Sequence, residues 1–340
     1  MTDVTLTLQE AHELVFQALV ANRTSAENAR QVADALVAAE AAGQPGHGLS
    51  RVPVYAVQSR SGKVDGYVMP EMEKAAPGLL RIDARNGFAY PAISLALEAL
   101  PEMARTQGIA MAAIRRSHHF GLGGAHCEVL ADKGLVSFVF GNAPAAIAPW
   151  GGKTALFGTN PIAFAAPVPG QPALVIDMAM SNVAKGKIMR AEMLGQPIPE
   201  GWALDEDGNP TTDASKAMKG TMVPIGGAKG AALALMVDVL GGALLGAALG
   251  HQAPSLFKAD GPPMDLGQVI IAIDPQLSSF GAFGDKMLAL VDAIDGVEGA
   301  RLPGSRRIGL REAARRDGLK LPQPIHDEIR ALAGRVGRAA

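Results

Sequence analysis

The sequence is short of cysteine, of aromatic residues and of net charge, and each shortage excludes a class of protein. Cys127 is the single cysteine among 340 residues, which rules out an intrachain disulfide and gives no support to a disulfide-stabilised secreted domain. Lysine and arginine number 31 against 33 acidic residues, so the net charge of -2 provides no basic excess for nucleic acid or an anionic membrane. We therefore expect neither nucleic acid nor a membrane as a partner.

A basic and then apolar leader is also lacking at the start of the sequence, so we expect a cytoplasmic protein. The one long apolar stretch, residues 230–250, has Asp238 in its middle. Its charge-free remainder is about half of the roughly 20 residues that span a bilayer. We expect this stretch to form a buried helix whose small residues let other elements approach closely.

The fingerprint G-x-G-x-x-G, which marks a Rossmann dinucleotide site between a strand and a helix, is absent. Gly151-Gly152-Lys153-Thr154 resembles the end of a phosphate-binding P-loop. That loop needs a glycine five positions before Gly152, where this sequence has Ile147. A P-loop is therefore disfavoured.

What the sequence does contain indicates a large globular protein of two domains, or one domain with an appended unit. Hydrophobic residues make up 48% and charged residues 19%, proportions that are normal for a folded core. Thr7 and Glu10 have the spacing of a capping box and predict a helix to about residue 22. Ser25 can cap a second helix that ends near Gly43, so the first 75 residues are predicted to be largely helical.

The middle of the chain has the pattern of an α/β unit. Short apolar runs bounded by turn residues predict buried strands at residues 79–82, 109–114, 135–140, 161–166, 174–178 and 269–273. Helical patterns alternate with them at residues 90–106, 122–133, 184–193 and 229–245. From about residue 302 the sequence is again helix-like and rich in arginine, and we expect it to pack on the N-terminal helices.

His47 and Arg51 are the first candidate pair for chemistry. They lie four residues apart after a Gly/Pro-rich loop, so one helical turn could direct an imidazole and a guanidinium at one small molecule. Reduction of a 2-oxo acid needs forked donors for the carboxylate and a proton donor for the carbonyl oxygen, which Arg and His supply. The alternative is an ordinary surface turn.

A second candidate is the loop of His118 and His119, which follows a predicted strand. Gly121, Gly123 and Gly124 come next and permit close approach of the backbone to a ligand. The alternatives are a histidine that caps the next helix, or a metal site, which the lack of a full ligand set around His126 and Cys127 disfavours.

Asp177 and Lys229 are weaker candidates. Asp177 ends an apolar run, where a carboxylate can accept hydrogen bonds from ribose hydroxyls. Lys229 opens a predicted helix, whose N-terminus and cation could hold a pyrophosphate. A solvated lysine in the first turn of the helix is an equally good reading of Lys229.

Taken in order, these segments resemble the malate/L-lactate dehydrogenase type 2 family, the malate, lactate and sulfolactate dehydrogenase-like oxidoreductases. The resemblance covers nearly the whole chain. The matching blocks are Gly46-His47-Gly48-Leu49-Ser50-Arg51, Ser117-His118-His119-Phe120-Gly121, Gly141-Asn142, Ala148-Pro149-Trp150-Gly151-Gly152, Phe157-Gly158-Thr159-Asn160-Pro161, Ile176-Asp177-Met178-Ala179, Pro199-Glu200-Gly201-Trp202, Lys229-Gly230 and Leu302-Pro303-Gly304.

The resemblance implies a fold that is not Rossmann: a non-Rossmann NAD(P)-binding α/β domain inserted in a mainly helical domain. On this reading residues 1–75 and 301–340 form the helical domain, and residues 76–300 form the α/β domain. The family also implies a homodimer, a cofactor that is NAD or NADP, no metal, and a small-molecule carboxylate as substrate.

The resemblance further assigns roles to residues of this sequence. It implies His47 or His119 as the catalytic proton donor or acceptor, with Arg51 and Thr159 binding substrate. The residues that it places near the cofactor are His119, Phe120, Gly121, Asp177, Met178, Ala179, Lys229, Gly230, Gly304, Ser305 and Arg306.

Three positions depart from the family pattern. Gly46 replaces the serine that usually precedes the loop histidine and can orient its ring, and Ser50 is too far along to be assumed a substitute. Ser305 replaces an acidic residue of the C-terminal turn, which leaves a nucleotide contact in question. Lys187 stands where cyclic-imine reductases have an aspartate, which argues for a 2-oxo acid substrate.

The sequence therefore predicts an NAD(P)-dependent 2-hydroxyacid dehydrogenase of the malate, lactate or sulfolactate type. An NAD(P)H-dependent reductase of cyclic imino acids, of the piperideine or pyrroline-2-carboxylate type, is the enzymatic alternative. A binding protein that keeps the cofactor site without catalysis is the alternative from another class, raised by Gly46. Turnover of a panel of substrates separates the three.

Overall fold

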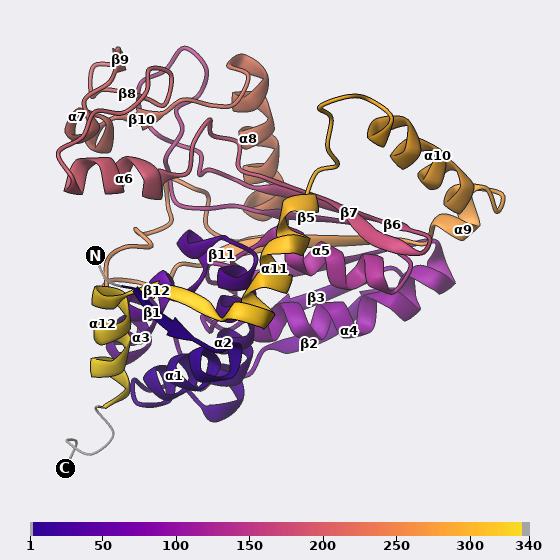
Figure 1. The fold of residues 1–340 in the computed structure, drawn as a ribbon, viewed down its shortest axis with the longest axis horizontal. Helices are drawn as coiled ribbons and strands as arrows, with labels where there is room; N and C mark the ends of the chain where they lie inside the picture. Colours follow the sequence, from indigo (N-terminus) through magenta and orange to yellow (C-terminus); the bar gives the residue numbers. More distant parts are fainter. Residues whose placement is uncertain (1–2, 335–340) are drawn as a thin grey trace.

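The computed structural model describes residues 3–334 and has a mixed α/β fold around a central sheet, as the sequence predicted (Figure 1). The sheet has seven strands. In spatial order they are β2 (Glu71–Ala76), β3 (Leu79–Asp83), β4 (Ile109–Ser117), β11 (Leu266–Ile273), β5 (Val136–Gly141), β6 (Ile162–Val168) and β7 (Gln171–Met178). β3 and β4 are parallel, and all other neighbouring strands are antiparallel.

All six predicted apolar runs form strands of this sheet, within a few residues of the predicted bounds. β11 lies in the middle between β4 and β5, and nearly all of its residues are buried, which explains its unbroken apolar sequence. β2 was not predicted, because its sequence is largely charged and every residue is exposed. It forms an edge hairpin with β3, so the sheet begins at Glu71.

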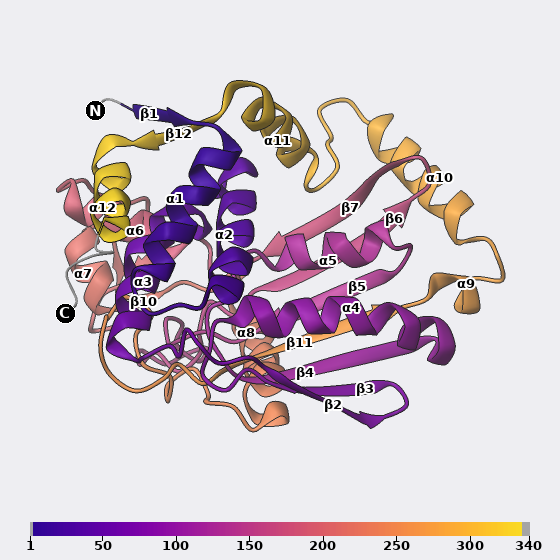
Figure 2. The same cartoon turned by 90° about the horizontal axis from the view of Figure 1, so that it is seen from below.

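Helices cover both faces of the sheet. α4 (Ala89–Gln107) and α5 (Gly123–Asp132) pack on one face, and α8 (Ala228–Gly241) and α10 (Phe283–Asp295) lie on the other (Figures 1 and 2). A Cβ atom on Gly123 would come within 2.9 Å of the Ala163 Cβ, so α5 approaches β6 where both residues are small. The scarcity of aromatic residues thus corresponds to close helix-to-sheet packing.

The two ends of the described chain pack together. Helices α1 (Leu8–Val20), α2 (Ala26–Ala41) and α3 (Val52–Ser61) share one core with α11 (Ser305–Asp317) and α12 (Gln323–Ala333), and β1 (Asp3–Leu6) pairs antiparallel with β12 (Leu319–Pro322). The predicted capping box at Thr7 and the cap at Ser25 are both present. The packing of the C-terminal segment on the N-terminal helices is confirmed, although residues 335–340 lie outside the described residues.

A smaller unit with its own core lies beside α8 (Figure 1). Its elements are α6 (Lys185–Met193), β8 (Ala203–Leu204), β9 (Pro210–Thr211), α7 (Ala214–Lys219) and β10 (Thr221–Met222). Only α6 was predicted, because strands of two residues carry no period that a sequence pattern can detect. The remaining helix, α9 (Pro275–Ser278), is a single turn.

The prediction of a buried helix in residues 230–250 is wrong in part. α8 ends at Gly241 and is followed by a short 3-10 turn, η3 (Ala243–Leu245). Only 39% of the stretch Ala228–Leu245 is buried, because apolar residues surround the helix and only one side meets the sheet. By length and composition alone, this is the one helix of residues 3–334 that could cross a membrane, a test that a core helix also passes.

Candidate active site

His47 and Arg51 lie on two consecutive 3-10 turns that lead directly into α3. These turns are η1 (Pro45–His47) and η2 (Leu49–Arg51). The Glu40 side chain accepts a hydrogen bond of 2.8 Å from the Leu49 backbone N–H, and a Cβ atom on Gly48 would overlap that carboxylate. Glu40 of α2 therefore holds this turn in place, and the fixed turn sets the direction of the His47 and Arg51 side chains.

The structure brings the two candidate histidines together. The rings of His47 and His119 are stacked, with centroids 5.2 Å apart and planes at 4° to each other. His119 Nδ1 lies 2.6 Å from the hydroxyl oxygen of Tyr55, a fully buried residue of α3. His118 is buried, its ring lies edge-on to Tyr55 with centroids 5.1 Å apart, and its Nε2 lies 3.0 Å from Gln58 Oε1. Tyr55 thus contacts both His118 and His119.

All three histidines are held neutral by their surroundings. Burial and, second, the Arg51 guanidinium lower the pKa of His47 to about 4. The same two causes, in the same order, hold the pKa of His119 well below its ordinary value. Burial lowers the pKa of His118 to about 3. At neutral pH the stacked pair can accept a proton from a hydroxyl group, or donate a ring N–H to a carbonyl oxygen.

Tyr55 can fix the tautomer of His119. Burial raises the pKa of Tyr55 to about 12, so its phenol keeps its proton. A phenol that donates to Nδ1 of a neutral imidazole leaves the ring proton on Nε2. His119 would then present Nε2–H as a donor.

Arg51 is oriented by two contacts. Its Nε donates a hydrogen bond of 2.6 Å to the Gly46 carbonyl oxygen, and the guanidinium lies 5.3 Å from the ring centroid of Phe257. Gly46 therefore contributes a backbone carbonyl, where relatives of the predicted family have a serine. The hydroxyl of Ser50 donates to the Pro45 carbonyl, so Ser50 does not replace that serine beside His47.

The glycine-rich loop after His119 joins the histidine pair to the N-terminus of α5. Gly121 has a φ of 70°, and a Cβ atom there would come within 2.8 Å of the Tyr90 hydroxyl. His126 Nε2 lies 2.8 Å from the Phe120 carbonyl and ties the loop to the helix. The Phe120 side chain is buried, so only its backbone can line a cofactor site.

Asp177 lies at the N-terminus of α5. Its Oδ2 accepts a hydrogen bond of 2.8 Å from the Gly124 backbone N–H, and burial raises the pKa of this carboxyl. The turn at Gly304 approaches the same place: a Cβ atom on Gly124 would come within 2.8 Å of Arg307 Nη1. Ser305 and Arg306, which the sequence predicted as cofactor ligands, are exposed, whereas Arg307 reaches Asp177.

Backbone hydrogen bonds link Thr159 to the segment after β7, and that segment to the loop before α8. The Thr159 carbonyl accepts a hydrogen bond of 2.7 Å from Met180, and the Met180 carbonyl accepts one of 2.9 Å from Ile225. Lys229 is exposed in the first turn of α8, as predicted, and Gly230 is buried. A Cβ atom on Gly230 would overlap the Ile225 carbonyl.

The adjacent Met178 and Ala179 follow Asp177 at the end of β7, and Met178 is 45% exposed. The predicted cofactor residues thus lie on three neighbouring segments: the start of α5, the end of β7 with the start of α8, and the start of α11. The glycines at these places let the segments pack closely on one another, since a Cβ atom on Gly124, Gly230 or Gly304 would meet protein atoms. The exposed Lys229 and Met178 and the N-terminus of α5 are groups that fit an extended dinucleotide.

Four residues near these groups were missed by the sequence interpretation: Tyr55, Tyr90, Phe257 and Arg307. Tyr55 could have been found, because it follows Arg51 by one helical turn, as Arg51 follows His47. Phe257 could not, because it is about 200 residues from Arg51 in the chain and lies in an irregular loop. Arg307 was one position from a predicted residue.

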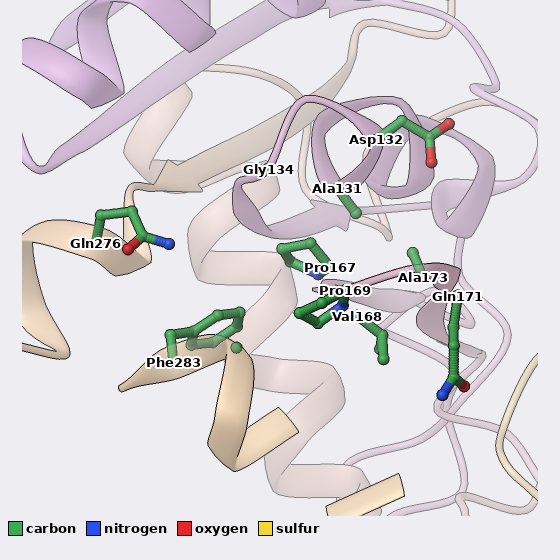
Figure 3. A pocket seen from close by; sticks show the side chains of 11 residues that line it. Ala131, Asp132, Gly134, Pro167, Val168, Pro169, Gln171, Ala173, Gln276 and Phe283 are labelled. Carbon is green, nitrogen blue, oxygen red and sulfur yellow. The ribbon is translucent and has the colours of Figure 1, made fainter. Parts of the chain in front are cut away.

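A pocket lies away from these residues. It has a volume of about 340 Å³ and is at the C-terminal end of α5, between Asp132, the turn at Pro169 and Phe283 of α10 (Figure 3). None of the predicted site residues lines it. Within residues 3–334, no group of three or more His, Cys, Asp or Glu residues could hold a metal ion.

Comparison with known proteins gives the family. The family model described as malate/L-lactate dehydrogenase matches residues 6–330. The (2R)-3-sulfolactate dehydrogenase (NADP(+)) of Chromohalobacter salexigens is 48% identical over 328 residues, which cover 96% of this chain and 98% of that protein. A Delta(1)-pyrroline-2-carboxylate/Delta(1)-piperideine-2-carboxylate reductase of Pseudomonas aeruginosa is 41% identical over 332 residues, 97% of this chain and 99% of that protein.

Comparison with solved structures gives the same family. Delta1-piperideine-2-carboxylate reductase of Pseudomonas syringae superposes with a TM-score of 0.91 at 35% identity and covers 97% of this chain and 99% of its own. Sulfolactate dehydrogenase of Methanocaldococcus jannaschii has a TM-score of 0.90 at 29% identity, with 98% of each chain covered. The resemblance read from the sequence is confirmed: this chain belongs to the malate/L-lactate dehydrogenase family and is an oxidoreductase.

Proposed function

We propose that this chain is an NAD(P)-dependent 2-hydroxyacid dehydrogenase that acts on a small 2-hydroxy or 2-oxo acid of the malate, lactate or sulfolactate type. The observation that carries the proposal is the stacked, half-buried and neutral His47–His119 pair beside the Arg51 guanidinium. One group of this set binds a carboxylate, and the other two are suited to proton transfer at a neighbouring oxygen. The similarity to a sulfolactate dehydrogenase at 48% identity supports the same substrate class.

Each residue has a defined task in this proposal. The nicotinamide dinucleotide, held by the α5 N-terminus, Asp177, Lys229 and the turn at Gly304, supplies or accepts the hydride when bound. Arg51 holds the substrate carboxylate, and Thr159 assists it. His47 removes the proton from a 2-hydroxy acid, or returns it to the oxygen of a 2-oxo acid. Burial around the pair excludes water and strengthens these interactions.

The NADP(+)-dependent relative supports a nicotinamide dinucleotide as cofactor, and both NAD and NADP are kept in the proposal. We further propose residues 76–300 as the cofactor-binding domain and residues 1–75 with 301–340 as the helical domain. The shared core of the N-terminal and C-terminal helices supports this division. A cytoplasmic location is part of the same proposal.

A cyclic imino acid reductase is the second candidate. The similarity to the reductases of P. aeruginosa and P. syringae favours it. The imine substrates carry a carboxylate that Arg51 could also bind. Lys187, at the position where the resemblance places an aspartate in imine reductases, lies on α6 with its ammonium 6.0 Å from the Trp202 ring centroid. The absence of that aspartate keeps this candidate second.

The exposed apolar side of α8 supports the proposal of a homodimer. Leu235 and Val239 on α8 are 48% and 49% exposed, and Leu244 on the following turn η3 is 56% exposed. An exposed apolar surface of this kind is typical of an interface. Val239→Glu should shift the protein from dimer to monomer in light scattering. A monomeric wild-type protein would refute the dimer.

A substrate panel tests the proposed function. Pyruvate, oxaloacetate and sulfopyruvate, and the cyclic imines as competitors, are offered with NADH or NADPH, and loss of the reduced cofactor's absorbance is recorded. We expect at least one 2-oxo acid to have the highest kcat/KM. Preference for an imine would favour the second candidate. Binding of cofactor without turnover of any compound would favour a binding protein without catalysis.

A further inference from the structure

The segment of residues 253–260, called the strap here, has no regular secondary structure but is held firmly to the end of α3. Gln58 Nε2 donates hydrogen bonds to the carbonyl oxygens of Leu256, at 2.7 Å, and Lys258, at 2.9 Å. The Gln58 side chain also bonds to His118, beside the stacked histidine pair. A buried amide therefore links the strap to the active-site core.

A buried lysine holds the same segment. Lys63 is 1% exposed, and its ammonium donates to the carbonyl oxygens of Ser255, at 2.6 Å, and Lys258, at 2.9 Å. Burying an ammonium without a carboxylate partner is costly unless its hydrogen bonds are made, and here backbone carbonyls make them. Ser61 adds a bond of 2.6 Å to the Ala259 carbonyl. So many directed bonds give an irregular loop a single conformation.

The two central side chains of the strap have different surroundings. Leu256 is buried and packs with Met264 and Leu266, which anchors the strap. Phe257 is partly exposed, and its ring lies 5.3 Å from the guanidinium carbon of Arg51. The anchored strap thus places an aromatic ring on one face of the proposed carboxylate-binding group.

With this ring in place, only part of Arg51 is left for a ligand. Its Nε is bonded to the Gly46 carbonyl, and one face is covered by Phe257. Within residues 3–334, no hydrogen bond or ion pair engages Nη1 or Nη2 of Arg51. These two nitrogens form the edge of the guanidinium that matches two oxygens of a planar carboxylate.

We propose that Phe257 is a specificity-determining residue, and that Gln58 and Lys63 act through the strap as positioning residues for it. The ring keeps the Arg51 guanidinium in one orientation. Both a carboxylate and a phosphonate can pair with its Nη edge, but a coplanar carboxylate keeps its oxygens in the guanidinium plane. A tetrahedral anion puts an oxygen out of that plane, where the electron-rich face of Phe257 disfavours it. This inference rests on the proposed function, because it takes the ligand of Arg51 to be the carboxylate of a 2-oxo or 2-hydroxy acid.

The first test replaces Phe257 and measures ligand binding directly. Oxamate, a planar analogue of pyruvate, and acetylphosphonate, a tetrahedral one, are titrated by calorimetry into protein saturated with cofactor. Phe257→Leu keeps an apolar side chain but removes the aromatic face, and should weaken oxamate binding about 5-fold while changing acetylphosphonate binding less. Phe257→Tyr should restore the wild-type preference. Phe280→Leu, at a fully exposed phenylalanine, is the matched control and should change neither.

The second test asks whether Lys63 works through Phe257. Lys63→Met removes the ammonium and keeps an apolar stem, and should weaken oxamate binding by a similar factor with unchanged affinity for cofactor. In the Lys63→Met/Phe257→Leu double variant the two losses of oxamate affinity should not add. The reason is that Lys63→Met alone already releases the Phe257 ring from Arg51. A merely structural role of Lys63 predicts additive losses and would refute the coupling.

The outcomes separate this proposal from the proposed function. If wild-type protein binds oxamate and Phe257→Leu keeps the wild-type ratio of oxamate to acetylphosphonate affinity, the role of Phe257 is refuted and the proposed function stands. If wild-type protein binds neither analogue and reduces no 2-oxo acid, both the proposed function and this inference are refuted.

Discussion

The substrate side and the cofactor side of the site are built differently. On the substrate side the rings of His47 and His119 are stacked, the buried Tyr55 is bonded to His119, and Arg51 is bonded to the Gly46 carbonyl. On the cofactor side Lys229, Ser305 and Arg306 are exposed, and Asp177 accepts a hydrogen bond from the Gly124 backbone. These contacts fix the first region before any ligand arrives, whereas the second presents exposed charged groups. His119 belongs to both regions, because the loop that follows it leads to the start of α5.

This difference predicts which region controls the reaction rate and which controls the affinity for cofactor. A prearranged cluster gives rate, because its dipoles and proton carriers need no reorganisation during the reaction. An open, solvated surface gives affinity for a large cofactor that must also leave. Substitutions on the substrate side should therefore affect kcat strongly, and those on the cofactor side should chiefly affect the Kd of the cofactor.

The largest effect is expected for His47. His47→Asn should lower kcat by about 10² to 10⁴, the range for loss of a general acid or base, with the cofactor Kd nearly unchanged. His119→Asn, in the loop that leads to α5, should weaken cofactor binding more than it slows chemistry. Separate titrations of cofactor and substrate measure both. If His119→Asn abolishes the chemical step while His47→Asn stays active, the two roles are exchanged.

The second-largest effect is expected for Arg51. Arg51→Lys keeps the charge but loses the forked geometry and the Nε bond to Gly46. Hydrogen bonds to charged groups contribute about 1.5–3 kcal/mol, so kcat/KM should fall roughly 10- to 150-fold, with losses in both kcat and KM. Lys229→Met on the cofactor side is the comparison and should raise the cofactor Kd instead. Near-normal kinetics of Arg51→Lys would show that the carboxylate is bound elsewhere.

A smaller effect is expected for Tyr55, whose hydroxyl bonds to His119 Nδ1. Tyr55→Phe removes that bond and should reduce kcat about 10-fold, since a neutral hydrogen bond contributes roughly 0.5–1.5 kcal/mol. The ¹⁵N chemical shifts of the His119 ring should change from one tautomer to a mixture. Tyr67→Phe, at an exposed tyrosine, is the control. Unchanged ring shifts in Tyr55→Phe would refute the orienting role.

The sequence predicted much of the fold, because its signals are local. The apolar runs became β3 to β7 and β11, and the caps at Thr7 and Ser25 formed as expected. The edge strand β2 was not predicted because all of its residues are exposed, and the two-residue strands were not predicted because they are too short to show a period. The partial exposure of α8 was missed because hydrophobicity alone does not say which elements are available to cover a helix.

The site was predictable only in part. The motif blocks named His47, Arg51 and His119, but not that the two rings would stack, because they come from α3's entry turn and from the loop after β4. Phe257 reaches Arg51 from an irregular segment placed by buried polar bonds, and no spacing in the sequence encodes such a contact. Long-range geometry of this kind is available only from the folded chain.

The smallest effect concerns the dependence of stability on pH, and it sharpens the contrast between the buried and the open side. The pKa of His118 is about 3 in the folded chain, lowered chiefly by burial, and about 6.5 when unfolded. Between these values the unfolded chain binds more protons, so the stabilisation is present above about pH 6.5 and is lost as pH falls toward 3. From pH 7.5 to 5.5 this histidine should lower the free energy of unfolding by about 1 kcal/mol. Urea unfolding of His118→Asn should therefore show a shallower dependence on pH than the wild type, whatever its stability at pH 7.5. His251→Asn, at an exposed histidine, is the control variant. If both variants have the wild-type slope, His118 does not carry the penalty for a buried charge that its surroundings imply.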